Sequence, residues 1–359
     1  MVKANVLILP LLVFLLAGCG SESVMKENVA CTDSTDIQYA CEIRNPEDLV
    51  YFAPTNEIIF GEYGDMAIGR AGALSALDPA TMATRDLAIL SDGAEQWGDS
   101  NCEMLPAATL SPHGLDLSQR GDGSWQLLVV NHYQRESIEF FELSENADGA
   151  VLHTRGCVQM PAENRINDVA ATTDTSGFIV THMHEPDDGL AGLLNIPKFL
   201  MGLDTGYVLE WSPSSGFKRL PGSDGSFPNG VTIASDQKSY YLNQYTSSKV
   251  SHIDRTTGEL LNSWDVSHPD NSSLGSDGRL YVSSALGSVT DALECTPRDG
   301  FNCMIPFAIE AINLQDGSRE LVYKHEDGLI PVATVALPLN GSLYLGSYSS
   351  DRLSRVILK

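Results

Sequence analysis

Residues 228–242 read PNGVTIASDQKSYYL and contain the unit from which the fold is built. A polar opening motif, Pro228-Asn229-Gly230, leads into a short β-rich run. The turn Ala234-Ser235-Asp236-Gln237 follows, and a second apolar run begins at Tyr240. Short β-rich runs that alternate with Asp, Gly and Ser turns predict antiparallel strands joined by tight connections.

The same order of opening motif, strand, turn and apolar strand recurs six times along the chain. Six units in roughly 320 residues average about 50 residues each, which suits a four-stranded blade with its loops. We therefore predict an all-β fold, a six-bladed β-propeller whose opening motifs converge on a central tunnel. A β-sandwich would account for the number of strands but not for the repeated motif. The opening motifs are Asn45-Pro46-Glu47-Asp48, Pro112-His113-Gly114, Ile166-Asn167-Asp168, Pro228-Asn229-Gly230, Pro269-Asp270-Asn271 and Pro331-Val332-Ala333.

The N-terminal segment is typical of an exported protein. An apolar run, Val6 to Leu16, is too short to span a bilayer and matches a secretory signal. Leu16-Ala17-Gly18-Cys19 resembles the lipobox of bacterial lipoproteins, which implies cleavage before Cys19 and lipid attachment to its thiol. An ordinary signal peptide with an incidental cysteine is the alternative. We expect a signal peptide over 1–18, a flexible tether with lipidated Cys19 over 19–40, and the propeller over 41–359.

The predicted location is the bacterial cell envelope. Association with the membrane would run through the lipid on Cys19, in the outer membrane if the source is Gram-negative, because no Asp follows Cys19. The chain has 47 acidic and 22 basic residues and a formal net charge of −25. Such a surface repels phosphate backbones and excludes nucleic acid as an expected partner, but it does not repel divalent cations. We predict no protein partner.

Six cysteines remain besides Cys19, and an even number in an exported protein predicts disulfides. Short separations favour local pairs between Cys31 and Cys41 and between Cys295 and Cys303, which leaves Cys102 with Cys157. The sequence leaves the other pairings open. A thiolate zinc site is not favoured, because the chain contains no Cys-x-x-Cys.

The side chains of the opening motifs are rich in oxygen. Calcium takes six to eight oxygen ligands and accepts a mixture of carboxylates and amides. Magnesium or zinc matches less well, since the set contains no His or Cys and forms a roomy ring. The candidate ligands of a first ion are Glu47, Asn167, Asn229, Asp270 and Asn271.

Two opening motifs are doublets, in which Asp48 follows Glu47 and Asp168 follows Asn167. Consecutive residues of an extended chain point in opposite directions. We therefore expect Asp48 and Asp168 to face a second, more deeply buried cation, because a buried carboxylate pair without one is costly.

His113 and His132 lie 19 residues apart, a spacing that allows them to occupy neighbouring strands of one blade. A neutral imidazole is a suitable general base near pH 7, and a second imidazole can orient it and accept charge. Two polar side chains at strand ends are the alternative interpretation.

The order and spacing of these motifs resemble the paraoxonase/arylesterase family, from about residue 41 to the C-terminus. The strongest matches are Ser111-Pro112-His113-Gly114-Leu115, Leu127–His132 and the two doublets. The resemblance implies a six-bladed propeller with two calcium ions in its tunnel and hydrolysis of small-molecule lactones and aryl esters. It also implies roles for single residues. The catalytic calcium would be bound by Glu47, Asn167, Asn229, Asp270 and Asn271, the structural calcium by Asp48, Asp168 and the backbone carbonyl of Leu115, and the catalytic dyad would be His113 and His132.

This chemistry agrees with the residue types. A calcium ion with an open coordination position polarises an ester carbonyl, while His113 activates water and His132 takes up the proton. Glu47 or Asp270 could share the role of base. A serine nucleophile elbow has no support, because no Gly-x-Ser-x-Gly is present.

Two regions depart from the family pattern. The chain ends without the C-terminal cysteine that ties the family's termini together, so we expect strand pairing to close the ring. Leu190–Leu203 is apolar and predicts a short helix, interrupted at Pro197. A plain core helix is the alternative, whereas its position between blade strands and the resemblance favour a lid above an apolar pocket. His182-Met183-His184-Glu185 precedes it; a zinc cluster is the less favoured interpretation, and we expect His184 in the substrate-pocket wall.

Two other functions remain open. The chain could be a gluconolactonase-like sugar lactonase, which shares a metal ring but does not need the two histidines. It could also be a non-catalytic, surface-anchored binding propeller that keeps calcium only for stability.

Overall fold

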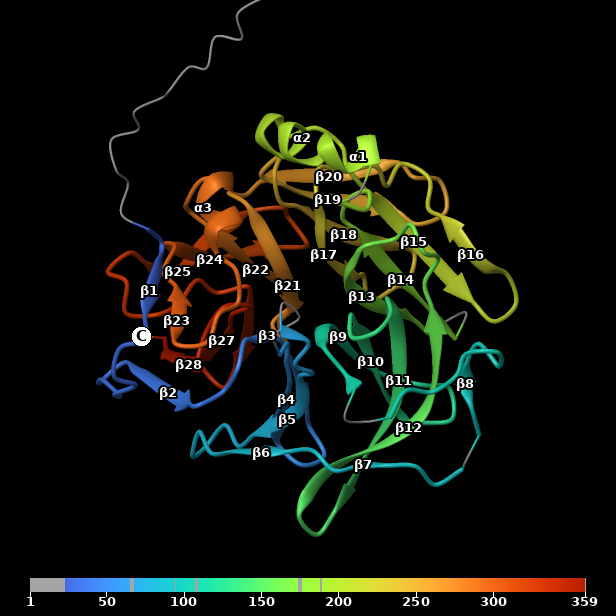
Figure 1. Cartoon of the computed structure of the whole chain (residues 1–359), viewed down its shortest axis with the longest axis horizontal. Coiled ribbons are helices and arrows are strands. Elements are labelled where there is room, and N and C mark those ends of the chain that lie inside the picture. Colours follow the sequence, from blue (N-terminus) through green and yellow to red (C-terminus); the bar gives the residue numbers. More distant parts are fainter. Residues whose placement is uncertain are drawn as a thin grey trace, which may run out of the picture.

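The computed structural model describes residues 23–358 except 65–67, 94, 107–108, 174–175 and 188. It is a six-bladed β-propeller, as the repeated opening motif predicts. In Figure 1 the inner strands β3, β9, β13, β17 and β21 lie nearest the middle of the molecule. These strands and β26 contact one another in a closed ring. The opening motifs therefore meet around one axis.

The first three blades run from the inner strand outward in chain order. The first contains β3 (Pro46–Phe52), β4 (Glu57–Glu62), β5 (Ala73–Leu77) and β6 (Thr84–Asp86). The second contains β9 (Pro112–Gln119), β10 (Trp125–Asn131), β11 (Ser137–Asn146) and β12 (Gly149–Gln159), with β7 (Ile89–Leu90) and β8 (Trp97–Gly98) parallel to β12. The third contains β13 (Ile166–Thr172), β14 (Gly177–His182), β15 (Tyr207–Ser212) and β16 (Gly216–Arg219).

The last three blades follow the same plan, except that the sixth combines both ends of the chain. The fourth contains β17 (Pro228–Ile233), β18 (Ser239–Gln244), β19 (Lys249–Asp254) and β20 (Leu260–Asp265). The fifth contains β21 (Pro269–Leu274), β22 (Arg279–Ala285), β24 (Phe307–Asn313) and β25 (Arg319–His325). The sixth contains β26 (Val335–Leu339), β27 (Ser342–Gly346), β28 (Arg352–Ile357) and β2 (Ile37–Cys41).

Strand pairing closes the ring, as expected. The N-terminal strand β2 pairs antiparallel with β28, from Ile37 opposite Val356 to Cys41 opposite Arg352. Upstream of it, β1 (Met25–Glu27) pairs with β23 (Phe301–Cys303). The expectation of a flexible tether over residues 19–40 is therefore wrong for the described part of that segment, because both of its strands belong to the folded body. Cys19 and the predicted signal peptide lie outside the described residues.

Hydrophobic clusters fill the spaces between adjacent blades. Each cluster joins the facing sides of two sheets; Phe140 of the second blade, for example, packs against Phe178 and Trp211 of the third. Apolar side chains that point away from a strand on both faces explain why the inner and middle strands read as almost continuous apolar runs. This packing fixes the inner strands and, with them, the opening motifs.

The three predicted cysteine pairs are all present as disulfides, Cys31–Cys41, Cys102–Cys157 and Cys295–Cys303. Three short helices complete the described chain: α1 (Gly189–Leu193), α2 (Asn195–Met201) and α3 (Val289–Glu294), which lie together at the top of Figure 1. Among the described residues, no helix has the length and hydropathy needed to cross a membrane.

The predicted lid helix is present in two pieces, but its break differs from the prediction. The interruption falls at Leu194, between α1 and α2, and not at Pro197. Pro197 lies in the first turn of α2, where a backbone N–H has no partner within the helix, so that proline is tolerated there.

Candidate active site

The opening motifs surround a cavity of about 290 Å³ at one end of the tunnel. Five blades each place one polar side chain of their opening motif in its lining, and Thr334, immediately before β26, completes the ring. The structure thus brings most of the predicted ligands together with His113 in one place. The polar residues of the five blades are Glu47, His113, Asn167, Asn229 and Asp270.

A β-bulge lies at the opening motif in five of the six blades. The pairing register shifts between Pro46 and Leu49, and equivalent shifts occur on or opposite the other motifs. A bulge leaves residues unpaired and redirects their side chains, which is why bulges are frequent beside active sites. The bulges free the polar residues of the motifs from the sheet ladder and aim them into the tunnel.

Four buried oxygens of the opening motifs have no hydrogen-bond partner within the described part of the chain. Three belong to residues that line this cavity, whereas Asn271, predicted as a ligand of the same ion, lines a second cavity and reaches the ring through its contact with Glu47. A buried polar atom without a partner costs free energy, so acceptor oxygens that converge from separate blades indicate a site for a cation. Oxygens from one carboxylate and several neutral amides match the ligand preference of calcium. The residues present therefore fit a calcium ion. The four atoms are Glu47 Oε2, Asn167 Oδ1, Asn229 Oδ1 and Asn271 Oδ1.

One hydrogen bond joins two residues of the opening motifs across the tunnel. Asn271 donates from Nδ2 to Glu47 Oε1 at 2.8 Å, which turns its Oδ1 away from Glu47. Burial, followed by the neighbouring Glu47 charge, raises the pKa of Asp270 well above its ordinary range. Two carboxylates in one buried ring repel each other, so the ionised ring needs a cation.

Asp48 and Asp168 lie one residue further along their strands and line a second cavity of about 410 Å³. Later residues of the inner strands line this cavity, so it forms the other end of the tunnel. The doublets are thus divided as predicted from strand alternation: Glu47 and Asn167 face the first cavity, and the two aspartates face the second.

The two inner aspartates are held by backbone donors from the next blade. Leu115 N–H donates to Asp48 Oδ2 at 2.7 Å, and Val231 N–H donates to Asp168 Oδ2 at 2.7 Å. Leu115 was expected to contribute its carbonyl, and its observed bond to Asp48 is made by its N–H. Gly114 is required there, because a Cβ atom would lie 2.4 Å from Asp168 Oδ1.

Both inner aspartates are poor anions in the absence of a cation. Burial is the larger cause that raises the pKa of Asp48 well above its ordinary value, with the charge of Glu47 next. For Asp168 burial is again the larger cause, with the charge of Asp48 next. A divalent cation between them would remove both penalties, and two carboxylates suit calcium.

His113 and His132 are directly hydrogen-bonded. His113 Nδ1 lies 2.8 Å from His132 Nε2. The other nitrogen of His113, Nε2, faces the ring, 3.4 Å from Asn167 Nδ2 and 3.5 Å from Glu47 Oε1. The pair therefore connects the cavity to the loop between β10 and β11 of the second blade.

The sequence did not identify Glu136 as part of this chain of contacts. Both of its carboxylate oxygens lie 3.0 Å from His132 Nδ1. Burial raises the pKa of Glu136, but the hydrogen bond and charge of His132 outweigh it and the net pKa is lowered. The sequence feature that could have identified Glu136 is its position, four residues after the second histidine.

Glu136 fixes the direction of the hydrogen bonds. If His132 donates from Nδ1 to the carboxylate, its Nε2 must accept from His113 Nδ1. His113 Nε2 then carries a lone pair toward the cavity, where Asn167 Nδ2 can donate to it. This arrangement presents an imidazole base to the ring of oxygens.

Comparison with known proteins identifies the family of the chain. A family model described as Arylesterase matches residues 99–282, slightly more than half of the chain. The chain belongs to the arylesterase family. It is 25% identical over 257 residues to serum paraoxonase/arylesterase 1 of Mus musculus, covering 68% of this chain and 67% of that protein. Family membership indicates a hydrolytic enzyme.

Solved structures show the same fold at low sequence identity. A gluconolactonase from Xanthomonas campestris superposes with a TM-score of 0.52 at 15% identity, covering 90% of this chain and 89% of that one. A luciferin-regenerating enzyme superposes with a TM-score of 0.52 at 14% identity, covering 88% and 92%. These likenesses show the propeller fold.

One wall of the first cavity is apolar and comes largely from the helices and the loops around them. The wall residues are Met183, Phe199, Phe227, Tyr245, Val289, Ala292, Leu293 and Tyr348. Tyr63 covers the other side of the histidine pair, with ring centroids 5.2 Å from His113 and 5.8 Å from His132. Burial raises the pKa of Tyr63 to about 12, so it remains a neutral cover over the pair.

His184 does not line the cavity, contrary to the sequence prediction. Met183 takes that position, because neighbouring residues of extended chain face opposite ways. His184 packs behind the wall, with ring centroids 5.8 Å from Phe227 and 5.6 Å from Phe199. It supports the aromatic wall from outside.

The zinc interpretation of residues 182–185 gains no support. Among the described residues, no three His, Cys, Asp or Glu side chains gather as a metal site. His182 accepts a hydrogen bond from Arg165 N–H at 3.0 Å, and burial, the larger cause, lowers its pKa to about 4. It is a buried neutral imidazole.

Proposed function

We propose that this arylesterase is a calcium-dependent hydrolase of lactones and aryl esters. The observation that carries the proposal is the convergence of three partnerless oxygens, from Glu47, Asn167 and Asn229, in the cavity that His113 also lines. A first calcium ion would be held by Glu47, Asn167, Asn229, Asp270 and Asn271. A second would be held by Asp48, Asp168 and a backbone carbonyl, for which the Leu115 carbonyl remains the prediction.

Side chains of the protein supply the general base and hold it in position. When bound, calcium supplies a positive charge that polarises the ester carbonyl. His113 Nε2 takes a proton from the attacking water, because its lone pair faces the cavity. His113 Nδ1–H can pass a proton to His132 Nε2, and Glu136 stabilises the positive charge that results.

The cavity favours compact substrates with an apolar portion. Aromatic and aliphatic side chains form most of its wall, which suits an aryl group or a short acyl chain better than a hydroxylated sugar. This observation favours lactones and aryl esters over the sugar lactones of the alternative function.

A serine mechanism is not proposed, although one Ser-His-Asp line is present. Ser144 Oγ lies 3.1 Å from His153 Nε2, and His153 Nδ1 lies 2.9 Å from Asp92 Oδ2. These residues lie on the outer part of the second blade, outside the cavity lining, and Arg155 also binds the Asp92 carboxylate. Ser144→Ala is therefore a suitable control variant.

Chelation tests the proposal. Initial rates on a lactone panel and on phenyl acetate are measured before chelation, after complete removal of metal, and after calcium is restored. We expect turnover to fall to the background rate and to return with calcium. Unchanged hydrolysis by the fully stripped protein would contradict calcium dependence, and absence of turnover on every substrate with calcium present would favour the binding propeller.

We further propose that the protein is exported and lipid-anchored to the bacterial envelope through Cys19. The support is the lipobox-like Leu16-Ala17-Gly18-Cys19. Cys19→Ser is expected to move the protein from the membrane fraction to the soluble fraction. Equal membrane recovery of the variant would refute the anchor.

A further inference from the structure

The loop that carries His132 and Glu136 is braced from outside the cavity. It joins β10 to β11, and Asn131 and Ser137 face each other at its two ends. Asn131 is fully buried and donates from Nδ2 to Ser137 Oγ at 3.2 Å and to the Tyr133 carbonyl at 3.1 Å. The base of the loop is thus closed by side-chain hydrogen bonds.

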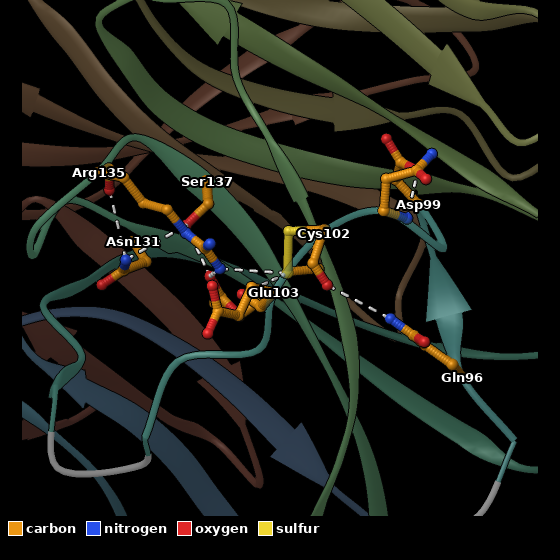
Figure 2. The surroundings of a disulfide bond; sticks show 10 residues. Gln96, Asp99, Cys102, Glu103, Asn131, Arg135 and Ser137 are labelled. Carbon is orange, nitrogen blue, oxygen red and sulfur yellow. Dashed lines mark hydrogen bonds and ion pairs between the residues drawn. A yellow bond between two sulfur atoms is a disulfide. The ribbon is translucent and has the colours of Figure 1, made fainter.

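Arg135 extends from this loop to a disulfide. Its Nη2 lies 3.1 Å from Cys157 Sγ and donates to Glu139 Oε1 at 3.1 Å. Figure 2 shows the guanidinium reaching toward the disulfide beside Cys102, with Ser137 and Asn131 on its other side. Arg135 is adjacent in sequence to Glu136, so its placement limits where the Glu136 backbone can lie.

Glu139 holds Arg135 in this position. Its side chain is 5% exposed, and burial raises its pKa despite the hydrogen bonds of Ser137 and Arg135. Ser137 Oγ donates to the same carboxylate oxygen at 2.6 Å. Removing a cation from a buried carboxylate is costly, so Arg135 has one strongly preferred orientation.

The disulfide supplies a covalent fixed point. Cys102–Cys157 connects β12 to the turn that follows β8, across 55 residues. Backbone hydrogen bonds from Asp99 N–H to the Cys157 carbonyl and from Cys102 N–H to the Asp99 carbonyl, both 2.9 Å, hold the same turn. The sulfur that contacts Arg135 is therefore part of a rigid outer edge of the second blade.

We propose that Arg135 is a positioning residue of the histidine pair, and that the Cys102–Cys157 disulfide is the support against which it sets the loop. Arg135 acts through Glu136, whose contact with His132 at 3.0 Å directs the proton chain to His113. This inference rests on the proposed function, because it assigns a purpose to the geometry of the pair.

Kinetics of substituted enzymes test the inference. Displacing a catalytic group by about 1 Å can cost up to 100-fold in rate. We expect Arg135→Met to lower kcat by about 10-fold with KM within about twofold of wild type, and Arg135→Lys to recover part of the loss. Arg279→Met, a matched surface arginine that pairs with Asp277 and Glu320, should leave kcat unchanged.

A double substitution separates positioning from charge balance. Glu139→Gln combined with Arg135→Met removes the buried charge along with its partner, so Tm should return toward that of wild type. We expect kcat to stay low in this variant. Recovery of kcat together with Tm would overturn the inference, because Arg135 would then only neutralise Glu139.

The disulfide is tested by removing it. Cys102→Ala with Cys157→Ala should lower kcat by about three- to tenfold, whereas the Cys31→Ala with Cys41→Ala pair, which removes a disulfide at the sixth blade, should change Tm more than kcat. Equal kcat in the Cys102 and Cys157 variant and in wild type would show that the disulfide gives no support.

A spectroscopic readout keeps this inference distinct from the proposed function. The Nδ1–H proton of His132, hydrogen-bonded to Glu136, should give a downfield NMR signal in wild type that Arg135→Met loses and Arg135→Lys keeps. If His113→Gln hydrolyses as fast as wild type, the proposed function fails, and this signal still tests the brace. Retention of the signal in Arg135→Met would overturn the inference.

Discussion

The polar side chains at the two ends of the tunnel differ in their hydrogen bonding. The outer end is the end at the first cavity, beside His113, and the inner end is the end at the second cavity. At the inner end, Asp48 and Asp168 each accept backbone N–H groups, including one from the neighbouring blade. At the outer end, Glu47 and the amides leave oxygens without partners beside His113. Hydrogen bonds therefore connect the inner carboxylates to the backbone, whereas the outer end presents acceptor oxygens that can bind a ligand.

This contrast indicates that the inner end contributes to stability and the outer end to catalysis. Donors from Leu115 and Val231 join consecutive inner strands through the inner carboxylates, so a change there weakens contacts between blades. The outer oxygens join strands through few protein bonds, such as that from Asn271 to Glu47. We expect outer substitutions to change turnover and inner substitutions to change stability.

The largest expected effect is at the outer end, in His113→Gln. Glutamine removes the lone pair that faces the cavity, and a positioned general base contributes about 10²- to 10⁴-fold in rate. We expect a loss of kcat in this range with Tm unchanged, measured on a lactone and on phenyl acetate. Ser144→Ala serves as control and should keep the wild-type rate. A rate of His113→Gln within about threefold of wild type would show that the pair is not the base.

The inner end is tested by Asp168→Asn, which retains a hydrogen-bond acceptor but loses a charge toward the second ion. Ligand at 100 times its Kd stabilises a fold by about 2.7 kcal/mol. Losing the inner ion should therefore lower Tm by about 5 °C in calcium, with thermal unfolding as the measurement.

The comparison between the two ends decides the meaning of that result. Asn229→Ala, at the outer end, should lower turnover and leave Tm within about 2 °C of wild type. If both variants lower Tm equally, the two ends do not differ in role. Calcium titrations followed by Tm would then show one site rather than two.

The repeat and the convergence of the opening motifs could be predicted from sequence, because each motif combines a turn residue with an oxygen-bearing side chain at a similar interval. The bulges could not, since they depend on the register of the neighbouring strand. Glu136 reaches His132 because the intervening loop turns back at Gln134, whose φ is +63°. Sequence alone does not specify that turn.

Two other differences arise from long-range contacts. The segment expected to be a tether pairs with residues near 300, at β23, which no local pattern indicates. His184 lies behind the wall because its ring stacks on Phe227 and its Nδ1 is hydrogen-bonded to Asn195 Nδ2 of α2. In both cases the partner lies on a separate element, so local composition could not reveal the outcome.

The smallest expected effect concerns the pH dependence of the metal-free protein. Asp116 lies beside the inner aspartates, and burial raises its pKa to about 6 from an ordinary value of 3.8. The folded state then binds this proton more tightly than the unfolded state, so the stabilisation is present at low pH and is lost as pH rises from about 4 to about 6. The raised pKa values of Asp48, Asp168 and Asp270 act in the same direction.

Chelated protein should therefore become less stable as pH rises through this window, and calcium should flatten the dependence, because bound cation keeps the inner carboxylates ionised in the folded state. The lowered pKa values of Glu136 and of the more exposed Asp122, Asp254, Asp277 and Asp316 act in the opposite sense. Urea unfolding at about pH 4.5 and about pH 6.5 measures the difference. Asp116→Asn should reduce it, while Asp148→Asn, an exposed carboxylate, should leave it unchanged. A metal-free protein that gains stability over the same interval would show that the inner carboxylates are ionised without a cation, and the distinction between the two ends would then rest on turnover alone.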